Sequence, residues 1–75
     1  MKIDRVTLAI LRRIKAAHGE NISQKELCRA GRVSLPTTLR RVEYLQNAGL
    51  IEHERYTRFY DITPAGIATL EEFDG

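Results

Sequence analysis

Apolar positions along the chain repeat at helical spacing, then alternate, and then repeat at helical spacing again. Near the N-terminus, Ile10, Leu11 and Ile14 recur at the spacing of one helix face. Asp4 precedes this run as a favoured N-cap residue, and Gly19 follows it as a stop signal. The pattern therefore predicts a first helix that packs its apolar face into a core.

Two further helical segments follow in close succession. The sequence "SQKE", beginning at Ser23, is a capping box, and Gly31 ends the short helix that it opens. Ser34 is a second N-cap, and the helix after it, with a proline in its first turn, runs to about Ala48. Two such helices joined by a glycine-containing turn form a helix-turn-helix, predicted here over residues 23–48.

The second of these helices is amphipathic. At about 100° per residue, its buried face is predicted to hold Leu35, Leu39, Val42 and Leu45, with Thr38 and Gln46 at its edges. The rest of its surface is predicted to hold Pro36, Thr37, Arg40, Arg41, Glu43, Tyr44 and Asn47. This surface is either a solvated charged face or one that enters a nucleic-acid groove.

Alternation in the strand manner begins at Leu50 and predicts a two-stranded hairpin over residues 50–63. Its tip is expected near Tyr56 and Thr57, and the turn type stays open because no Asn-Gly or Asp-Gly pair is present. Thr63 then caps a last helix over residues 64–73, which has proline at its first position. The residues expected to point inward from that helix are Ile67, Leu70 and Phe73.

Composition and length limit the class of protein. A chain of 75 residues, 43% hydrophobic and 29% charged, is typical of one globular domain, residues 1–75. Residues 1–58 hold all 12 Lys and Arg side chains and six carboxylates, so their net charge is +6. Residues 59–75 hold four carboxylates and no Lys or Arg, so their net charge is −4. This division favours a polyanionic partner, although many solvated surfaces have a similar balance.

Several classes of function are not expected from the residues present. Cys28 is the one cysteine, so an internal disulfide is excluded and a reducing cytoplasm is indicated. With it, His18 and His53 lack the paired spacing of a zinc site. The sequence contains no glycine-rich phosphate loop or Ser/His/Asp set, so neither an enzyme nor a cofactor is expected. No apolar run is long enough to span a membrane, and the N-terminus is not a secretory signal.

The segment "ISQKELCRAGRVSLPTTLRRVEYLQNAGLIEHERYTRFYDITPAG" resembles the winged helix-turn-helix domain of MarR-type transcription regulators. The resemblance covers roughly residues 21–66 and rests on "SQKEL", "VS", "TTLRRVEYL", "NAGLIEHE" and "ITPAG" taken together. It implies an α+β fold: a three-helix bundle with a two-stranded hairpin wing and a C-terminal helix. It also implies that the helix from Ser34 enters the major groove of double-stranded DNA and that the wing touches the backbone or minor groove.

Chemistry and resemblance together assign candidate contacts with DNA. Arg40 is the candidate for a bidentate contact with guanine, and Thr37 for a base edge or a thymine methyl group. Arg41 could serve a base or a phosphate, and Tyr44 is as consistent with packing against a partner as with DNA contact. The remaining candidates for DNA contact, including contacts with phosphates, lie on the second helix, on the helix that follows it and on the wing. They are Gln24, Lys25, Ser34, Pro36, Arg55 and Arg58. Surface ion pairs within the hairpin are the alternative role for its two arginines.

The expected function is that of a small sequence-specific transcription regulator. Full-length MarR-type regulators carry extra helices at both ends for dimerisation and effector binding, so this chain is expected to be a minimal version with no evident small-molecule effector. A homodimer through the first and last helices is compatible with the sequence. The alternative is a winged-helix module that docks on another protein and does not bind DNA, because fold alone does not decide function.

Overall fold

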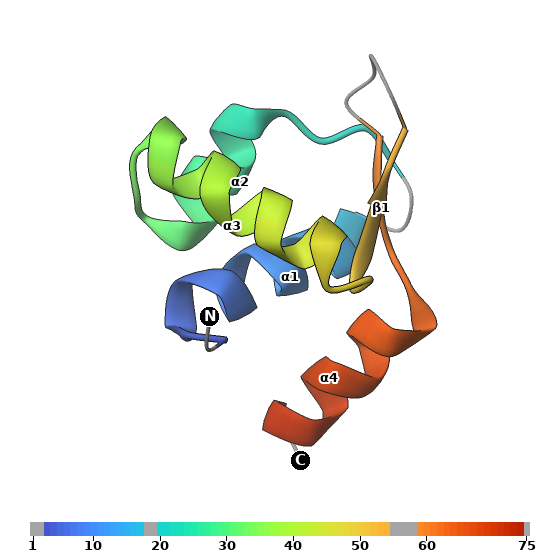
Figure 1. Cartoon of the computed structure of the whole chain (residues 1–75). Coiled ribbons are helices and arrows are strands. Elements are labelled where there is room, and N and C mark those ends of the chain that lie inside the picture. The colour runs from blue at the N-terminus through green and yellow to red at the C-terminus, as the bar shows by residue number, and fades with distance from the viewer. Residues whose placement is uncertain (1–2, 18–19, 55–58, 75) are drawn as a thin grey trace.

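The computed structural model describes residues 3–17, 20–54 and 59–74 of the chain. Three helices pack together, a two-stranded antiparallel hairpin lies at one side of them, and a fourth helix follows the hairpin in the chain (Figure 1). This arrangement confirms the predicted winged helix-turn-helix fold. The elements in order are α1 (Arg5–Ala17), α2 (Gln24–Gly31), α3 (Leu35–Asn47), β1 (Ile51–His53), β2 (Tyr60–Ile62) and α4 (Pro64–Asp74).

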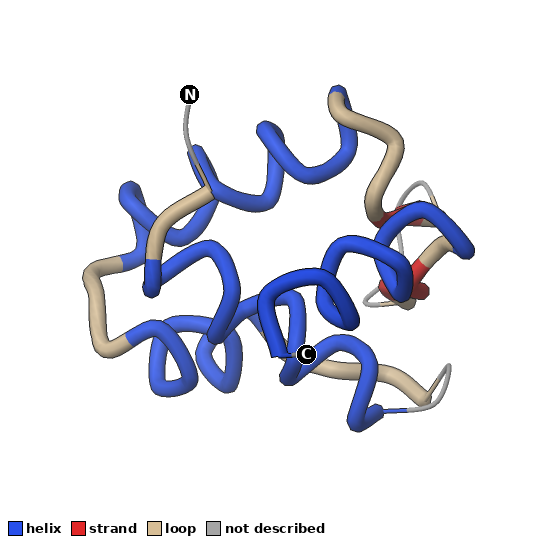
Figure 2. Tube along the Cα trace, turned by 90° about the horizontal axis from the view of Figure 1, so that it is seen from below, coloured by secondary structure: helices blue, strands red, loops and turns tan. Residues whose placement is uncertain are grey.

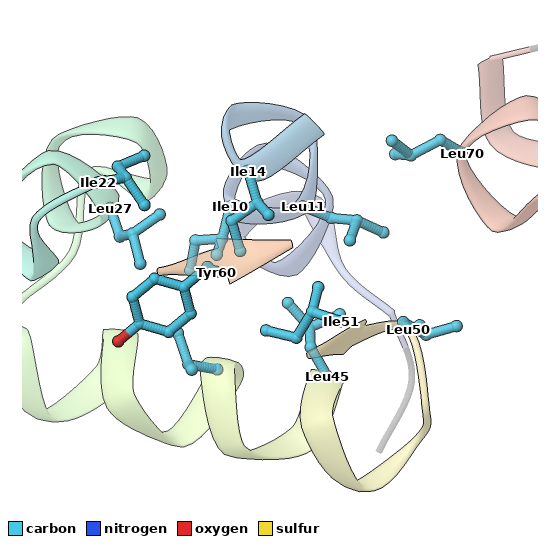
Figure 3. Packing of buried hydrophobic residues seen from close by; sticks show 11 residues of the cluster. Ile10, Leu11, Ile14, Ile22, Leu27, Leu45, Leu50, Ile51, Tyr60 and Leu70 are labelled. Carbon is cyan, nitrogen blue, oxygen red and sulfur yellow. The ribbon is translucent and has the colours of Figure 1, made fainter. Parts of the chain in front are cut away.

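Helix α1 lies at the centre of the fold and contacts α2, α3, α4 and β2. The two strands lie together at one side of the helices (Figure 2). Figure 3 shows apolar side chains from all of these elements pointing into one core. Its fully or almost fully buried members are Ile10, Leu11, Ile14, Ile22, Leu27, Val42, Leu45, Leu50, Ile51, Tyr60 and Leu70.

Short-range hydrogen bonds explain where three helices begin. The Asp4 carboxylate accepts bonds from the backbone N–H and the hydroxyl of Thr7, both at 2.8 Å. The Ser23 hydroxyl accepts from the N–H of Glu26 at 3.1 Å, and the Thr63 hydroxyl accepts from the N–H of Gly66 at 3.1 Å. The three bonds donated by backbone N–H groups satisfy donors that the first turn of a helix leaves open. The predicted caps at these positions are confirmed.

Each of two helices is followed by a residue in the left-handed backbone conformation, which is a glycine in one case and an arginine in the other. After α3, Gly49 has φ 75°, and the N–H groups of Gly49 and Leu50 bond back to Gln46 and Leu45. After α2, the left-handed residue is Arg32, with φ 55°, and not a glycine. Gly31 instead serves close packing, because a Cβ there would lie 3.2 Å from Val6 Cγ1.

The hairpin pairs Ile51 with Ile62, Glu52 with Asp61, and His53 with Tyr60. The rings of His53 and Tyr60 stack with centroids 4.2 Å apart. Glu52 and Asp61 are both exposed and directly opposite one another, an arrangement of like charges that weakens a sheet. The predicted tip at Tyr56 and Thr57 lies outside the described residues.

Helix α4 approaches the chain between α3 and β1 very closely at Gly66. The Thr63 hydroxyl also donates to the carbonyl of Gly49 at 2.7 Å, and the Thr63 N–H donates to the carbonyl of Leu50 at 3.0 Å. A Cβ built on Gly66 would lie 2.2 Å from the Leu50 carbonyl oxygen. The segment "TPAG" is therefore a cap followed by a contact that admits no side chain.

The predicted buried face of α3 is partly wrong. Val42 and Leu45 are buried as expected, but Leu35 and Leu39 are 45% and 39% exposed, and Thr38 is fully buried in their place. The Thr38 hydroxyl donates to the carbonyl of Ser34 at 3.0 Å. Because its own helix satisfies the hydroxyl, threonine is buried without an unpaired polar group.

The ends of α4 and α1 bear on two other predictions. Phe73, expected to point inward from α4, is 53% exposed, because the helix buries Gly66 and Leu70 and its last turn extends past the core. The predicted stop at Gly19 lies outside the described residues, although α1 ends at Ala17, close to the expected position.

Candidate nucleic-acid interface

The outward face of α3 carries the first set of candidate residues. Val42, Leu45 and Thr38 mark the side that faces the core, and Pro36 and Arg40 lie on the opposite side, both exposed. We call this side of α3, which points away from the core, its outer pole, and Arg40 is a cation there. The first turn of the helix is stabilised by its proline. A side chain so placed can reach past the helix backbone toward a ligand.

The adjacent arginine is placed quite differently. Arg41 Nη2 lies 3.0 Å from Asp4 Oδ2, and the Arg41 side chain is only 20% exposed. Hydrogen bonds from Thr7 are the main cause that lowers the pKa of Asp4, and the Arg41 charge lowers it further. One carboxylate therefore caps α1 and also holds an arginine of α3, which ties the two helices together.

The start of α2 and the turn before α3 place three more predicted residues at the surface. Gln24 and Lys25 are exposed in the first turn of α2, and Ser34 is exposed at the N-cap of α3. The Ser34 hydroxyl donates to Thr37 Oγ1 at 3.3 Å and does not cap a backbone N–H. Thr37 is half-buried.

Tyr44 belongs to both the surface and the interior. It is partly buried and packs against the hydrophobic core. Its ring therefore contributes to packing of α3 within the chain itself.

Two exposed cations near these residues were not among the predicted site residues. Arg29 on α2 and Arg32 in the turn are both exposed. The signal for Arg29 was its spacing of four from Lys25, which places both on one side of α2. No sequence signal distinguished Arg32, because its left-handed conformation next to a glycine is not visible in the sequence.

The wing contributes carboxylates in its described part. Glu52, Glu54 and Asp61 are exposed on the two strands and the residue after β1, and no Lys or Arg lies among residues 51–54 and 59–62. Arg55 and Arg58, the predicted contacts of the wing, lie outside the described residues. The described part of the wing is therefore acidic.

The described parts of the chain hold a surface depression but neither a metal-binding cluster nor a membrane-spanning helix. No group of three His, Cys, Asp or Glu side chains there could hold a metal ion. None of the described helices is long and apolar enough to cross a membrane. A surface depression of about 400 Å³ is lined by Arg13, Glu26, Arg29 and Ala30, but Arg13 and Glu26 pair with each other across it at 2.7 Å.

Comparison with known proteins identifies relatives of the whole arrangement. A sequence model of the MarR family matches residues 2–56. A Listeria innocua protein of unknown function superposes with a TM-score of 0.78 at 28% identity, over 97% of this chain and 52% of that one. No protein with a curated description matches the chain.

Two structures of MepR from Staphylococcus aureus are also similar. A mutant from a multidrug-resistant clinical isolate gives a TM-score of 0.77 at 24% identity, over 96% of this chain and 55% of that one. MepR described as a transcription regulator of the multidrug efflux pump MepA gives 0.77 at 20% identity, over 93% and 53%. These likenesses show the fold, and the present chain spans about half the length of each structure.

Proposed function

This chain belongs to the MarR family, and we propose that it is a sequence-specific DNA-binding protein that regulates transcription. In this proposal α3 lies in the major groove, and the wing meets the backbone or the minor groove. The groove of B-DNA admits one α-helix, and exposed side chains on such a helix can read base edges.

The observation that carries the proposal is the contrast between Arg40 and Arg41. Arg40 is exposed at the outer pole of α3, whereas Arg41 is held by Asp4 at 3.0 Å. We therefore assign base reading, as a bidentate contact with guanine, to Arg40. Arg41 keeps α3 in place and retains a part in phosphate contact through the small exposed part of its side chain.

Phosphate contacts come from the elements around α3 in this proposal. Lys25 and Gln24 stand at the N-terminus of α2, where backbone N–H groups and the helix dipole also favour an anion. Arg29 and Arg32 add two exposed cations. The wing tip, with Arg55 and Arg58, supplies the contact beyond the groove, and Ser34, Pro36 and Thr37 line the entry of α3.

The test begins with selection of bound duplexes from a random pool at about 50 mM salt, where phosphate contacts are strong. On the selected site, Arg40→Ala should remove about 1–3 kcal/mol of discrimination at one G·C pair. Lys25→Ala should instead weaken all duplexes alike and reduce the slope of log K against log[salt] by about one. Arg12→Ala is the control, because Arg12 lies on α1 and is paired with Asp74 of α4.

Two results would count against the proposal. If the purified protein retains no duplex at that salt concentration, DNA binding is refuted and the protein-docking alternative takes its place. If Arg40→Ala weakens every sequence equally, Arg40 is a phosphate contact and not the reading residue. The symmetry of the selected sites, with mass measured in solution, reports whether two copies bind together, since a two-fold dimer requires a palindromic site.

A further inference from the structure

Two leucines stand exposed on the helix that we propose to enter the groove. Leu35 is 45% exposed and Leu39 is 39% exposed. They are four residues apart, so their side chains are neighbours on one side of α3. At about 100° per residue, the two leucines lie on one flank of α3, between the side that faces the core and the outer pole that carries Pro36 and Arg40.

The surroundings of the leucines favour an anionic ligand with an apolar feature. Lys25, Arg29, Arg32 and Arg40 are exposed on the same helix-turn-helix, which also carries the exposed carboxylate of Glu43. A surface with this excess of positive charge is complementary to a polyanion. Double-stranded DNA meets both requirements. Its major groove presents one apolar group among polar base edges, the C5-methyl group of thymine.

We propose that Leu35 and Leu39 form a contact surface for thymine methyl groups, so that the preferred site places thymine close to the guanine read by Arg40. This inference rests on the proposed function. Four residues of helix rise about 6 Å, nearly two base-pair steps of about 3.4 Å each. The two leucines therefore reach methyl groups one or two steps apart.

Thr37 is the competing reader of a methyl group. At about 100° per residue, Thr37 lies on the other side of Arg40 from Leu39, toward the flank that holds Arg41. Thr37 is half-buried, and its hydroxyl is bonded to Ser34 at 3.3 Å. The large exposed hydrophobic side chains of this helix are therefore the two leucines, with the smaller ring of Pro36 exposed beside them.

The experiment replaces each thymine of the selected duplex with deoxyuridine, which removes the methyl group and keeps the base pair. Binding is measured for the wild type, Leu39→Ala and the double variant of Leu35→Ala with Leu39→Ala. Phe73→Ala is the matched control, because Phe73 is also an exposed apolar residue but lies on α4. Circular dichroism checks that each variant is folded.

Wild type and the Phe73→Ala control should lose about fourfold in affinity for each contacted methyl group that is removed. Leu39→Ala should lose that sensitivity at one thymine, and the double variant at both. If the wild type binds duplexes but deoxyuridine has no effect, or if the effect persists in the double variant, the inference is overturned while DNA binding stands. Absence of any duplex binding would instead refute the proposed function, and this inference with it.

Discussion

Gly66 offers a direct test of how α4 and the wing are joined. Its substitution by alanine adds one methyl group at a helical position. That methyl group would lie 2.2 Å from the carbonyl oxygen of Leu50 and 2.7 Å from Ile62 Cγ1. To reach even 3.0 Å from the oxygen, the two backbones must separate by at least 0.8 Å.

The magnitude follows from opposing effects. In an open helix, glycine to alanine stabilises by roughly 0.5–1 kcal/mol. Overpacking against a backbone costs about 1–3 kcal/mol or more, and the separation also strains the bond from Thr63 N–H to the Leu50 carbonyl, now 3.0 Å. We expect Gly66→Ala to lower the free energy of unfolding by about 2 kcal/mol, or Tm by about 8–16 °C.

Urea and thermal unfolding followed by circular dichroism would measure the effect. Gly49→Ala is the matched comparison, because Gly49 has open space but a φ of 75°. It should cost about 1–2 kcal/mol through backbone conformation alone. If Gly66→Ala is as stable as the wild type, or more stable, the close approach between α4 and the Leu50 carbonyl is refuted.

Two further predictions concern Asp4 and Arg32. The pKa of Asp4 is lowered in the folded state, so its stabilising effect is present above the unfolded pKa of about 4 and is lost as pH falls through the folded value. Asp4→Asn keeps the cap but not the charge, so we expect its unfolding free energy to be lower than that of the wild type at about pH 6. This difference should shrink as the pH falls to about 2; a difference independent of pH contradicts the assignment. Arg32→Gly should raise the unfolding free energy by about 0.5–1 kcal/mol, because Arg32 has φ 55° and glycine adopts this region freely; a lower Tm would contradict it.

The parts of the fold that the sequence predicted well are set by local interactions. Asp4, Ser23 and Thr63 each cap a helix through bonds to a residue three positions later. Such contacts depend on adjacent sequence, so a short motif reveals them. The stop at Gly49 is local in the same sense, since a left-handed residue after a helix favours glycine.

The rotation of α3 could not be read from its leucines. Counting apolar residues placed Leu35 and Leu39 inside, whereas the structure buries Thr38. A hydrogen bond from the Thr38 hydroxyl to the helix backbone removes the cost of burying that polar group, so threonine can take a core position. Long-range packing against α1 then selects the threonine side.

The candidate site shows the same division between local and distant causes. The sequence placed Arg40 and Arg41 together on the outer surface of one helix. It could not show that Asp4, far away in the chain, would hold Arg41 and leave its neighbour exposed. The sequence therefore indicated the element that forms the site, and the structure separated the roles of two adjacent arginines.

The paired carboxylates of Glu52 and Asp61 have a consequence for how the protein would search a genome. If DNA is bound as proposed, an acidic wing stem repels every duplex equally, target or not. The ratio of affinities for target and non-target sites is then unchanged, but dwell time on non-target DNA is shorter. Because non-target sites outnumber targets by about 10⁶ or more, a weaker uniform attraction leaves more protein free to reach its target.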